Sequence, residues 1–431
     1  MASTPLHELG AAEAAIRLAR RDLTAVALVR ACLDRIAQRE PELHAFACLD
    51  ADAALAQARA LDAGPIRGPL HGLPLGVKDL FDSVDLPTTY GSALYAGHRP
   101  SVDAAALALC REAGAVVVGK TVTTEFAYFQ PGPTRNPHHP GHTPGGSSSG
   151  SAAAVGAAML PLALGSQTAG SIIRPAAYCG VVGYQASLGR VPRAGIKTLS
   201  ETLDAFGGFG RSVRDVALLG AVLTGDPRLA AFDAWADAPA PRIAIVRTPE
   251  WAQADADVQA LFDALSHALT GSAATLVEIE LPAALADGVA LQKRVMAHEM
   301  ARALSHERVR HADRLSPRLR ALFDEGMAID GAQHAADLVC TGLARAAALR
   351  LLEQHDVLLA PSATGEAPVG LDATGDPVFC RLWTLLGLPC VHLPVGVGRH
   401  GLPIGLQAIG RRHDDHRLLG HAERLHLALT R

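Results

Sequence analysis

Apolar residues in the first 62 positions recur with helical spacing, so this part of the chain is predicted to form N-terminal helices. The clearest case is a set of four apolar residues at i, i+3, i+4 and i+7: Val29, Cys32, Leu33 and Ile36. Thr24 is a candidate N-cap for that helix, because its hydroxyl can accept a hydrogen bond from the first turn. Pro41 predicts the end of the helix.

After residue 62 the pattern changes to short apolar runs separated by glycine and proline, which predicts buried strands. These runs lie at 73–80, 115–119, 242–247, 275–281, 356–362, 389–398 and 402–410. Helices are predicted at about 102–113, at 151–159 and at the C-terminal end. Strands that alternate with helices favour an α/β layered fold.

The organisation that follows is one domain spanning residues 1–431. Residues 63–224 form the core that carries the motifs described below, and residues 346–431 return to the core sheet. Between them, residues 225–345 combine two strand patterns with long, arginine-containing helices. We interpret this segment as a variable, mostly helical insertion that shapes the pocket.

Composition narrows the classes of function. The 431 residues are 49% apolar and 19% charged, with a net charge of −4, which gives no footprint for nucleic acid or an anionic membrane. The seven cysteines include no CxxC pair, so free thiols in a reducing cytoplasm are expected. The first residues mix both charges and lack the apolar core of a signal peptide.

The stretch between Arg135 and Arg174 contains no Lys, Arg, Asp or Glu. A membrane helix needs about 20 continuous, mostly apolar residues. Prolines and a serine-rich run interrupt this stretch, so it is predicted to be buried protein interior.

Three local motifs suggest other chemistry and are set aside. GAVVVGKT (114–121) matches a phosphate-binding loop, but its β-branched centre is typical of a strand. GSSSG (146–150) matches a nucleophile elbow at Ser148, yet no strand precedes it, and a flexible linker is the other interpretation. The loop histidines His138, His139 and His142 lack the spacing of a metal site.

Lys78 is the most conspicuous ionisable residue of the chain. Lysine is scarce and arginine plentiful, yet this lysine lies within the apolar run LPLGVKDL (73–80). Burial disfavours an ammonium group and makes a neutral amine available as a base. The alternative is a structural ion pair with Asp79 or Asp82, and the residues alone favour neither interpretation.

A longer constellation carries a resemblance. LPLGVKDLFD (73–82), GGSSSGSAAAV (145–155) and GSQTAGSIIRPAAYCGVVGY (165–184) occur in the order and spacing of the amidase signature family. The similarity continues through TTEFAYF, NPHHP, DVLLAPS, TGDPVFCRLWTLLGLPC and GLPIGLQAIGRR. In detail the chain resembles malonamidase-type members. The resemblance implies a single α/β/α domain around a large mixed sheet.

It also implies roles for individual residues. Lys78 would be the base, Ser147 a proton relay held by a cis peptide bond after Gly146, and Ser171 the nucleophile. Backbone N–H groups at Thr168, Ala169, Gly170 and Ser171 would form the oxyanion hole. Arg174 would bind a substrate carboxylate, with a structural ion pair as the alternative.

Departures from the family pattern bear on substrate range. Gln167 stands where many members have Asp, and Gln185 where many have Lys. Ala169 replaces a common Gly, and alanine is unfavourable if that position needs a positive φ.

We therefore expect an amidase that cleaves C–N amide bonds of small carboxylate-bearing, malonamate-like amides through an acyl-enzyme on Ser171. No metal, nucleotide or organic cofactor is implied, and the expected partner is a small amide substrate. Neither a nucleic acid nor a membrane is expected, and a homodimer stays open. Two alternatives remain: a glutaminase resembling the A-type chains of glutamyl-tRNA amidotransferase with partner chains, and a non-catalytic binding protein on an amidase scaffold.

Overall fold

The computed structural model describes residues 4–236, 239–269 and 274–430. In these residues one mixed sheet contains eleven strands in the order β1-β3-β2-β4-β6-β5-β10-β11-β9-β7-β8. The strands are β1 (Phe46–Leu49), β2 (Pro74–Lys78), β3 (Val116–Thr121), β4 (Leu162–Gln167), β5 (Val182–Gln185), β6 (Ala205–Gly210), β7 (Arg242–Val246), β8 (Thr275–Ile279), β9 (Val357–Pro361), β10 (Cys390–Val397) and β11 (Pro403–Ile409). The expected single α/β domain around a large mixed sheet is therefore present.

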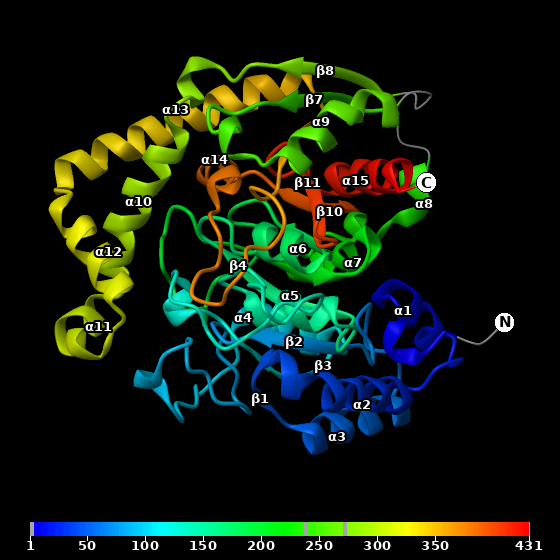
Figure 1. Cartoon of the computed structure of the whole chain (residues 1–431). Coiled ribbons are helices and arrows are strands. Elements are labelled where there is room, and N and C mark those ends of the chain that lie inside the picture. Colours follow the sequence, from blue (N-terminus) through cyan, green and yellow to red (C-terminus); the bar gives the residue numbers. More distant parts are fainter. Residues whose placement is uncertain (1–3, 237–238, 270–273, 431) are drawn as a thin grey trace.

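Helices lie along both faces and one side of this sheet (Figure 1). They are α1 (Ala11–Ala19), α2 (Ala25–Leu43), α3 (Ala51–Ala63), α4 (Ala105–Glu112), α5 (Ser149–Gly156), α6 (Ile173–Cys179), α7 (Val213–Thr224), α8 (Phe232–Ala236), α9 (Ala256–Ala268), α10 (Gly288–Ala303), α11 (Ser305–Arg310), α12 (Pro317–Ala328), α13 (Gly331–Gln354), α14 (Val378–Leu386) and α15 (Asp415–Leu429).

At strand β6, helices α7 and α6 cover opposite faces of the sheet. Successive strand residues face opposite sides of a sheet. A Cβ at Gly208 would meet Leu219 of α7, whereas the ring of Phe209 reaches the Gly165 and Ile172 side, where α6 begins. Gly207 is equally constrained, because a Cβ there would lie 1.9 Å from the carbonyl oxygen of Tyr184. The strand thus depends on glycine for close approach.

The predicted strand runs all contain strands, but the sequence predictions missed β1, β4, β5 and β6. The prediction that Pro41 ends its helix is wrong. Thr24 does cap α2, accepting a 3.2 Å hydrogen bond from the N–H of Ala27. The helix continues through Pro41 to Leu43 and ends where His44 adopts a left-handed conformation. A proline so near the C-terminus removes one hydrogen bond without preventing the last turn.

Residues 225–345 contribute to the sheet as well as to helices. Strand β7 pairs in parallel with β9 and with β8, so both extend the central sheet. Helices α10, α12 and α13 lie together along one side of the molecule, at the left of Figure 1. How variable this segment is stays a prediction.

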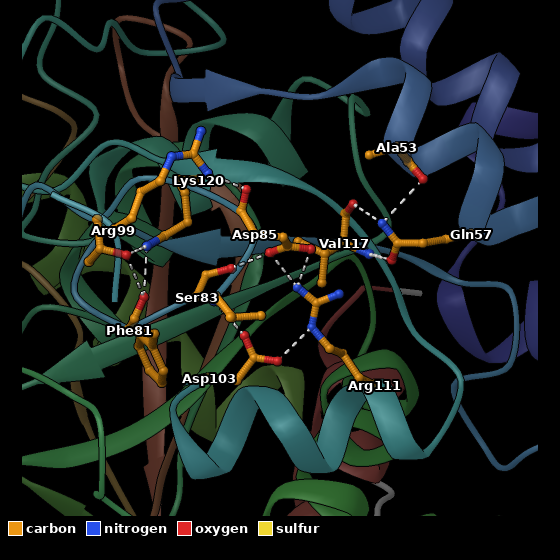
Figure 2. Close-up of polar contacts among 12 residues, drawn as sticks. Ala53, Gln57, Phe81, Ser83, Asp85, Arg99, Asp103, Arg111, Val117 and Lys120 are labelled. Carbon is orange, nitrogen blue, oxygen red and sulfur yellow. Dashed lines mark hydrogen bonds and ion pairs between the residues drawn. The ribbon is translucent and has the colours of Figure 1, made fainter. Parts of the chain in front are cut away.

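The GAVVVGKT motif forms strand β3, as its β-branched residues predict. Figure 2 shows Gln57 of α3 contacting both backbone groups of Val117, with the Val117 N–H donating to Oε1 at 3.3 Å. Lys120 Nζ donates to the Phe81 carbonyl at 2.7 Å and to Thr88 Oγ1 at 2.6 Å. The backbone N–H groups here therefore serve a sheet, and the lysine stabilises the neighbouring loop.

The charge-free stretch forms buried structure. Helix α5 and strand β4 both come from it, and their side chains are almost entirely inaccessible. Within the described part of the chain, no helix is long and apolar enough to cross a membrane.

Candidate active site

Two parallel strands place Lys78 beside Ser166. Strand β2 pairs with β4 through Leu75 with Leu162 and Gly76 with Ala163. Because the carboxyl ends of parallel strands meet at one edge of a sheet, Lys78 at the end of β2 lies beside the end of β4. This edge is the starting point of the site.

Lys78 is fully buried and surrounded by hydroxyl groups. Its Nζ donates to Ser147 Oγ at 2.7 Å and to Ser166 Oγ at 2.8 Å, with the Ser166 carbonyl at 3.4 Å. Burial lowers the pKa of Lys78 well below its usual value, while the charge of Asp204 opposes that shift. A neutral amine can accept a proton from the hydroxyl group of Ser147.

The alternative ion pair does not form in the described structure. Asp79 instead pairs with Lys120, whose Nζ lies 3.1 Å from Asp79 Oδ1. Asp82 accepts a hydrogen bond from the hydroxyl group of Tyr90 at 2.7 Å. Both acidic neighbours of Lys78 in the sequence therefore bind other partners.

Ser147 lies in the loop before α5, and the Gly146–Ser147 peptide bond is cis, as the resemblance implies. Arg174 Nη2 donates to the Gly146 carbonyl oxygen at 2.7 Å. The Thr124 N–H donates to the Ser147 carbonyl oxygen at 3.3 Å. The backbone on both sides of the Ser147 side chain is thereby held in place.

The loop of residues 168–171 follows β4 and leads into α6. None of its four backbone N–H groups donates a hydrogen bond to a residue that the structure describes. Buried N–H groups are normally paired, so four adjacent unpaired donors mark a place suited to an oxygen that carries negative charge. The hydroxyl group of Ser171 likewise makes no hydrogen bond to the described residues.

The side chain of Gln167 holds the backbone that follows this loop. Its Oε1 accepts from the N–H groups of Ile172 at 2.8 Å and Ile173 at 3.0 Å. Its Nε2 donates to Thr384 Oγ1 at 3.0 Å and to Gln185 Oε1. The two departures from the family pattern are thus in contact. A neutral amide pair lies where the resemblance would place an Asp and a Lys.

Ala169 and Gly170 show why the loop consists of small residues. Ala169 is absent from the described residues with positive φ, so the alanine carries no left-handed strain. A Cβ at Gly170 would lie 2.7 Å from Pro377 Cβ and 3.0 Å from Cys380 Cβ. The loop therefore packs directly against the start of α14. On its other side, Thr168 Oγ1 donates to Asp204 Oδ1 at 2.7 Å.

One pocket is lined by most of the predicted residues, although Lys78 and Gly170 are not among its lining residues. It is lined by Ser147, Thr168, Ala169, Ser171 and Arg174, together with Ala127, Tyr128, Phe129, Met296 and Met300. Both methionines come from α10, so this one helix of the 225–345 segment contributes to the wall of the pocket. The pocket thus places the two serines and the unpaired N–H groups around a shared space.

The sequence reasoning missed Ser166 and Gln292. Ser166 is the second hydroxyl partner of Lys78, and Gln292 Nε2 donates to the Thr168 carbonyl oxygen at 2.9 Å. Ser166 lies within the quoted motif 165–184, which was the only available signal for it. Nothing in the sequence pattern connects Gln292 with the loop, because more than a hundred residues separate them.

The residues of the set-aside motifs bond to the backbone. Ser148 Oγ donates to the Ser166 carbonyl at 3.3 Å, a contact with the backbone and not with a base. His138 Nε2 lies 2.9 Å from the Cys179 carbonyl oxygen, and His142 Nδ1 lies 2.7 Å from that of Ala367. These contacts fit residues that stabilise loops.

The chain is similar to several known proteins. The family model described as Amidase matches residues 27–419. The chain is 37% identical to the A-type chain of the glutamyl-tRNA(Gln) amidotransferase of Roseiflexus castenholzii, covering 96% of this chain and 95% of that protein. It is 35% identical to the putative amidase AmiD of Mycobacterium bovis, covering 97% and 94%. A chain of an inhibitor-bound vestigial protein complex, which reveals the evolutionary origins of an s-triazine catabolic enzyme, superposes with a TM-score of 0.89 at 26% identity over 97% of this chain and 98% of that chain.

Proposed function

The chain belongs to the amidase family and is an amidohydrolase, and from this premise we propose that it cleaves small carboxylate-bearing amides through a Ser171 acyl-enzyme. The observation that carries the proposal is the fully buried Lys78 amine, bonded to Ser147 at 2.7 Å without a carboxylate at ion-pair distance in the described residues. Burial lowers the pKa of Lys78 well below its usual value, and a lysine that has lost its proton is a base.

In the proposed reaction Ser171 Oγ attacks the amide carbon while its proton passes to Ser147 and the proton of Ser147 passes to Lys78. The oxyanion is bound by backbone N–H groups of Thr168, Ala169, Gly170 and Ser171, which donate to no other described residue. Ser147 then protonates the leaving nitrogen, ammonia departs, and water hydrolyses the ester along the same relay. The link between Ser171 and Ser147 would form when substrate enters, since hydrogen bonds at such sites often tighten on binding.

Arg174 supports a substrate with a carboxylate. It lines the pocket, and no carboxylate of the described residues lies within ion-pair distance of its guanidinium group. A malonamate-like acid would bring its own negative charge close to this cation. The seven cysteines are free thiols, which supports a cytoplasmic location. A homodimer stays a prediction.

The test is ammonia release from malonamate, succinamate, neutral aliphatic amides, aryl amides and glutamine. We expect release from the two acids, and its loss in Ser171→Ala. Release that persists in Ser171→Ala would contradict the assigned nucleophile. A best substrate that is neutral would contradict the acyl group.

A second candidate is a glutaminase that serves partner chains. The 37% identity to an amidotransferase chain of the A type over 96% of this chain supports it. Glutaminase activity that appears only after the other amidotransferase chains are added would favour this function. Activity of the isolated chain on malonamate would argue against it.

A further inference from the structure

Two arginines lie beside the pocket, and the sequence motifs drew attention to only one of them. Arg174 belongs to α6 and Arg381 to α14, and both side chains are at least nine-tenths buried. Their guanidinium carbons lie 5.5 and 5.8 Å from the centre of the Phe129 ring. Phe129 and Arg174 line the same pocket as Ser171, and Arg381 lies next to that pocket wall, beside the Phe129 ring.

Neither cation forms an ion pair with a carboxylate of the described residues. No carboxylate of these residues lies within 4.0 Å of either guanidinium group. Burial lowers the pKa of Arg381 to about 10, with the nearby Asp376 opposing the shift, so the group stays charged at neutral pH. Two buried charges of one sign are unfavourable together unless an anion joins them.

The two arginines differ in the donors that they have left. Arg174 Nη1 donates to the Gly375 carbonyl at 2.8 Å, and its Nη2 donates to the Gly146 carbonyl and to Thr374 Oγ1 at 3.1 Å. Both terminal nitrogens of that fork have a partner, whereas its buried Nε has none among the described residues.

Arg381 uses only Nη1, which donates to Gln292 Oε1 at 2.5 Å. Its Nε is buried without a hydrogen-bond partner in the described structure, and its Nη2 has no partner there either. One complete Nε–Nη2 edge is available, and this edge matches the two oxygens of a carboxylate.

We propose that Arg381 binds the carboxylate of the acyl group through its Nε–Nη2 edge, beside Arg174, which holds the Gly146 carbonyl and adds a second positive charge. The inference rests on the proposed amidase function and names the residue that selects acidic substrates. The Phe129 ring lies beside both guanidinium groups.

A purely structural role makes a different prediction. Arg381 holds Gln292, which in turn donates to the carbonyl of Thr168 at 2.9 Å. If Arg381 acted only through these two successive hydrogen bonds, its loss would disturb the 168–171 loop. Turnover of every amide would then fall to the same extent, whatever charge the substrate carries.

Malonamate and malonamide separate the two roles, because they have the same shape and differ by one negative charge. We expect Arg381→Gln to lower kcat/KM for malonamate by about 10- to 100-fold more than for malonamide, the usual range for losing a hydrogen bond to a charged group. Arg381→Lys keeps the charge and loses the planar edge, so its selectivity should fall in between. Equal losses on both substrates in both variants would overturn the proposal.

Arg211 offers a matched control. It is a partly buried arginine that donates to the Leu160 and Leu9 carbonyl oxygens, outside the pocket. Arg211→Gln should leave the ratio between the two substrates unchanged.

A binding measurement separates this inference from the amidase function itself. Malonate should raise the melting temperature of Ser171→Ala, and the increase should disappear in Ser171→Ala/Arg381→Gln. Malonate binding that depends on Arg381 supports the inference even if no amide is cleaved. Cleavage of neutral amides without malonate binding would uphold the amidase and overturn the inference.

Discussion

Lys78 is buried among the hydroxyl groups of Ser147 and Ser166, whereas Arg174 and Arg381 are buried against carbonyl oxygens, an amide and an aromatic ring. Ser147 from the first group and Arg174 from the second line the pocket. We call the two groups the hydroxyl side and the arginine side. A buried lysine can release its proton and become neutral, but a guanidinium group keeps its charge. The hydroxyl side is therefore suited to moving protons, and the arginine side to holding an anion.

The two sides also differ in how the chain assembles them. Residues 78–171 supply the hydroxyl side through neighbouring parallel strands and the loops that follow them. The arginine side joins Phe129, α6, α10 and α14, which are remote in sequence. Mutations on the first side should reduce the chemistry for every amide, and mutations on the second should depend on substrate charge.

The largest expected effect comes from removing the base. Lys78→Met should lower kcat by at least about 10³-fold, within the range for losing a general base. The loss should be the same for malonamate and malonamide, because the hydroxyl side does not sense the distal carboxylate. Ammonia release at saturating substrate measures it. A variant that kept a tenth of the activity would contradict Lys78 as the base.

Loss of the second buried lysine, Lys120, should reduce the stability of the fold more than loss of Lys78 does. Lys120→Met leaves Asp79 without its cation, and breaking a buried pair costs about 3–5 kcal/mol of unfolding free energy. Lys78→Met should cost far less, since no ion pair is broken. Urea unfolding of the two variants measures the difference. Equal destabilisation would contradict the contrast between a paired and an unpaired lysine.

A smaller effect is expected at the amide pair below the 168–171 loop. Gln167→Asp or Gln185→Lys alone places an unpaired charge in the interior and should cost roughly 2–4 kcal/mol of unfolding free energy. The double variant should recover most of that loss by forming the ion pair that the family pattern implies. Additive losses in the double variant would show that the two positions are independent.

The smallest expected effect is a shift in pH dependence. Burial raises the pKa of Asp204 to about 6, so the group is ionised above that pH and raises the pKa of Lys78. Asp204→Asn removes this negative charge, and the pKa of Lys78 should fall further. The acidic limb of kcat/KM should then move to lower pH, because the neutral amine persists at higher proton concentration. A shift to higher pH would contradict the assignment of that limb to Lys78.

Periodicity alone recovered much of the fold. The apolar runs at 73–80, 115–119 and 402–410 each contain a strand of the sheet. Strand β6 was missed because three of its six residues are glycine, and the backbone of Tyr184 and the side chain of Leu219 closely approach two of those glycines. Strand β1 was missed because it is only four residues long and lies between two helices. Both depend on neighbours that are distant in sequence.

The sequence by itself determined the residue types that amide chemistry requires: a lysine in an apolar strand, small residues in the 168–171 loop and serines at 147 and 171. Local patterns carry that information because each motif is short and continuous. Only the tertiary structure decided that Asp79 pairs with Lys120, that Ser166 completes the surroundings of Lys78, and that Arg381 keeps a free edge. Hydrogen bonds and charge balance in a buried site depend on which segments meet, and that is a property of the packed chain as a whole.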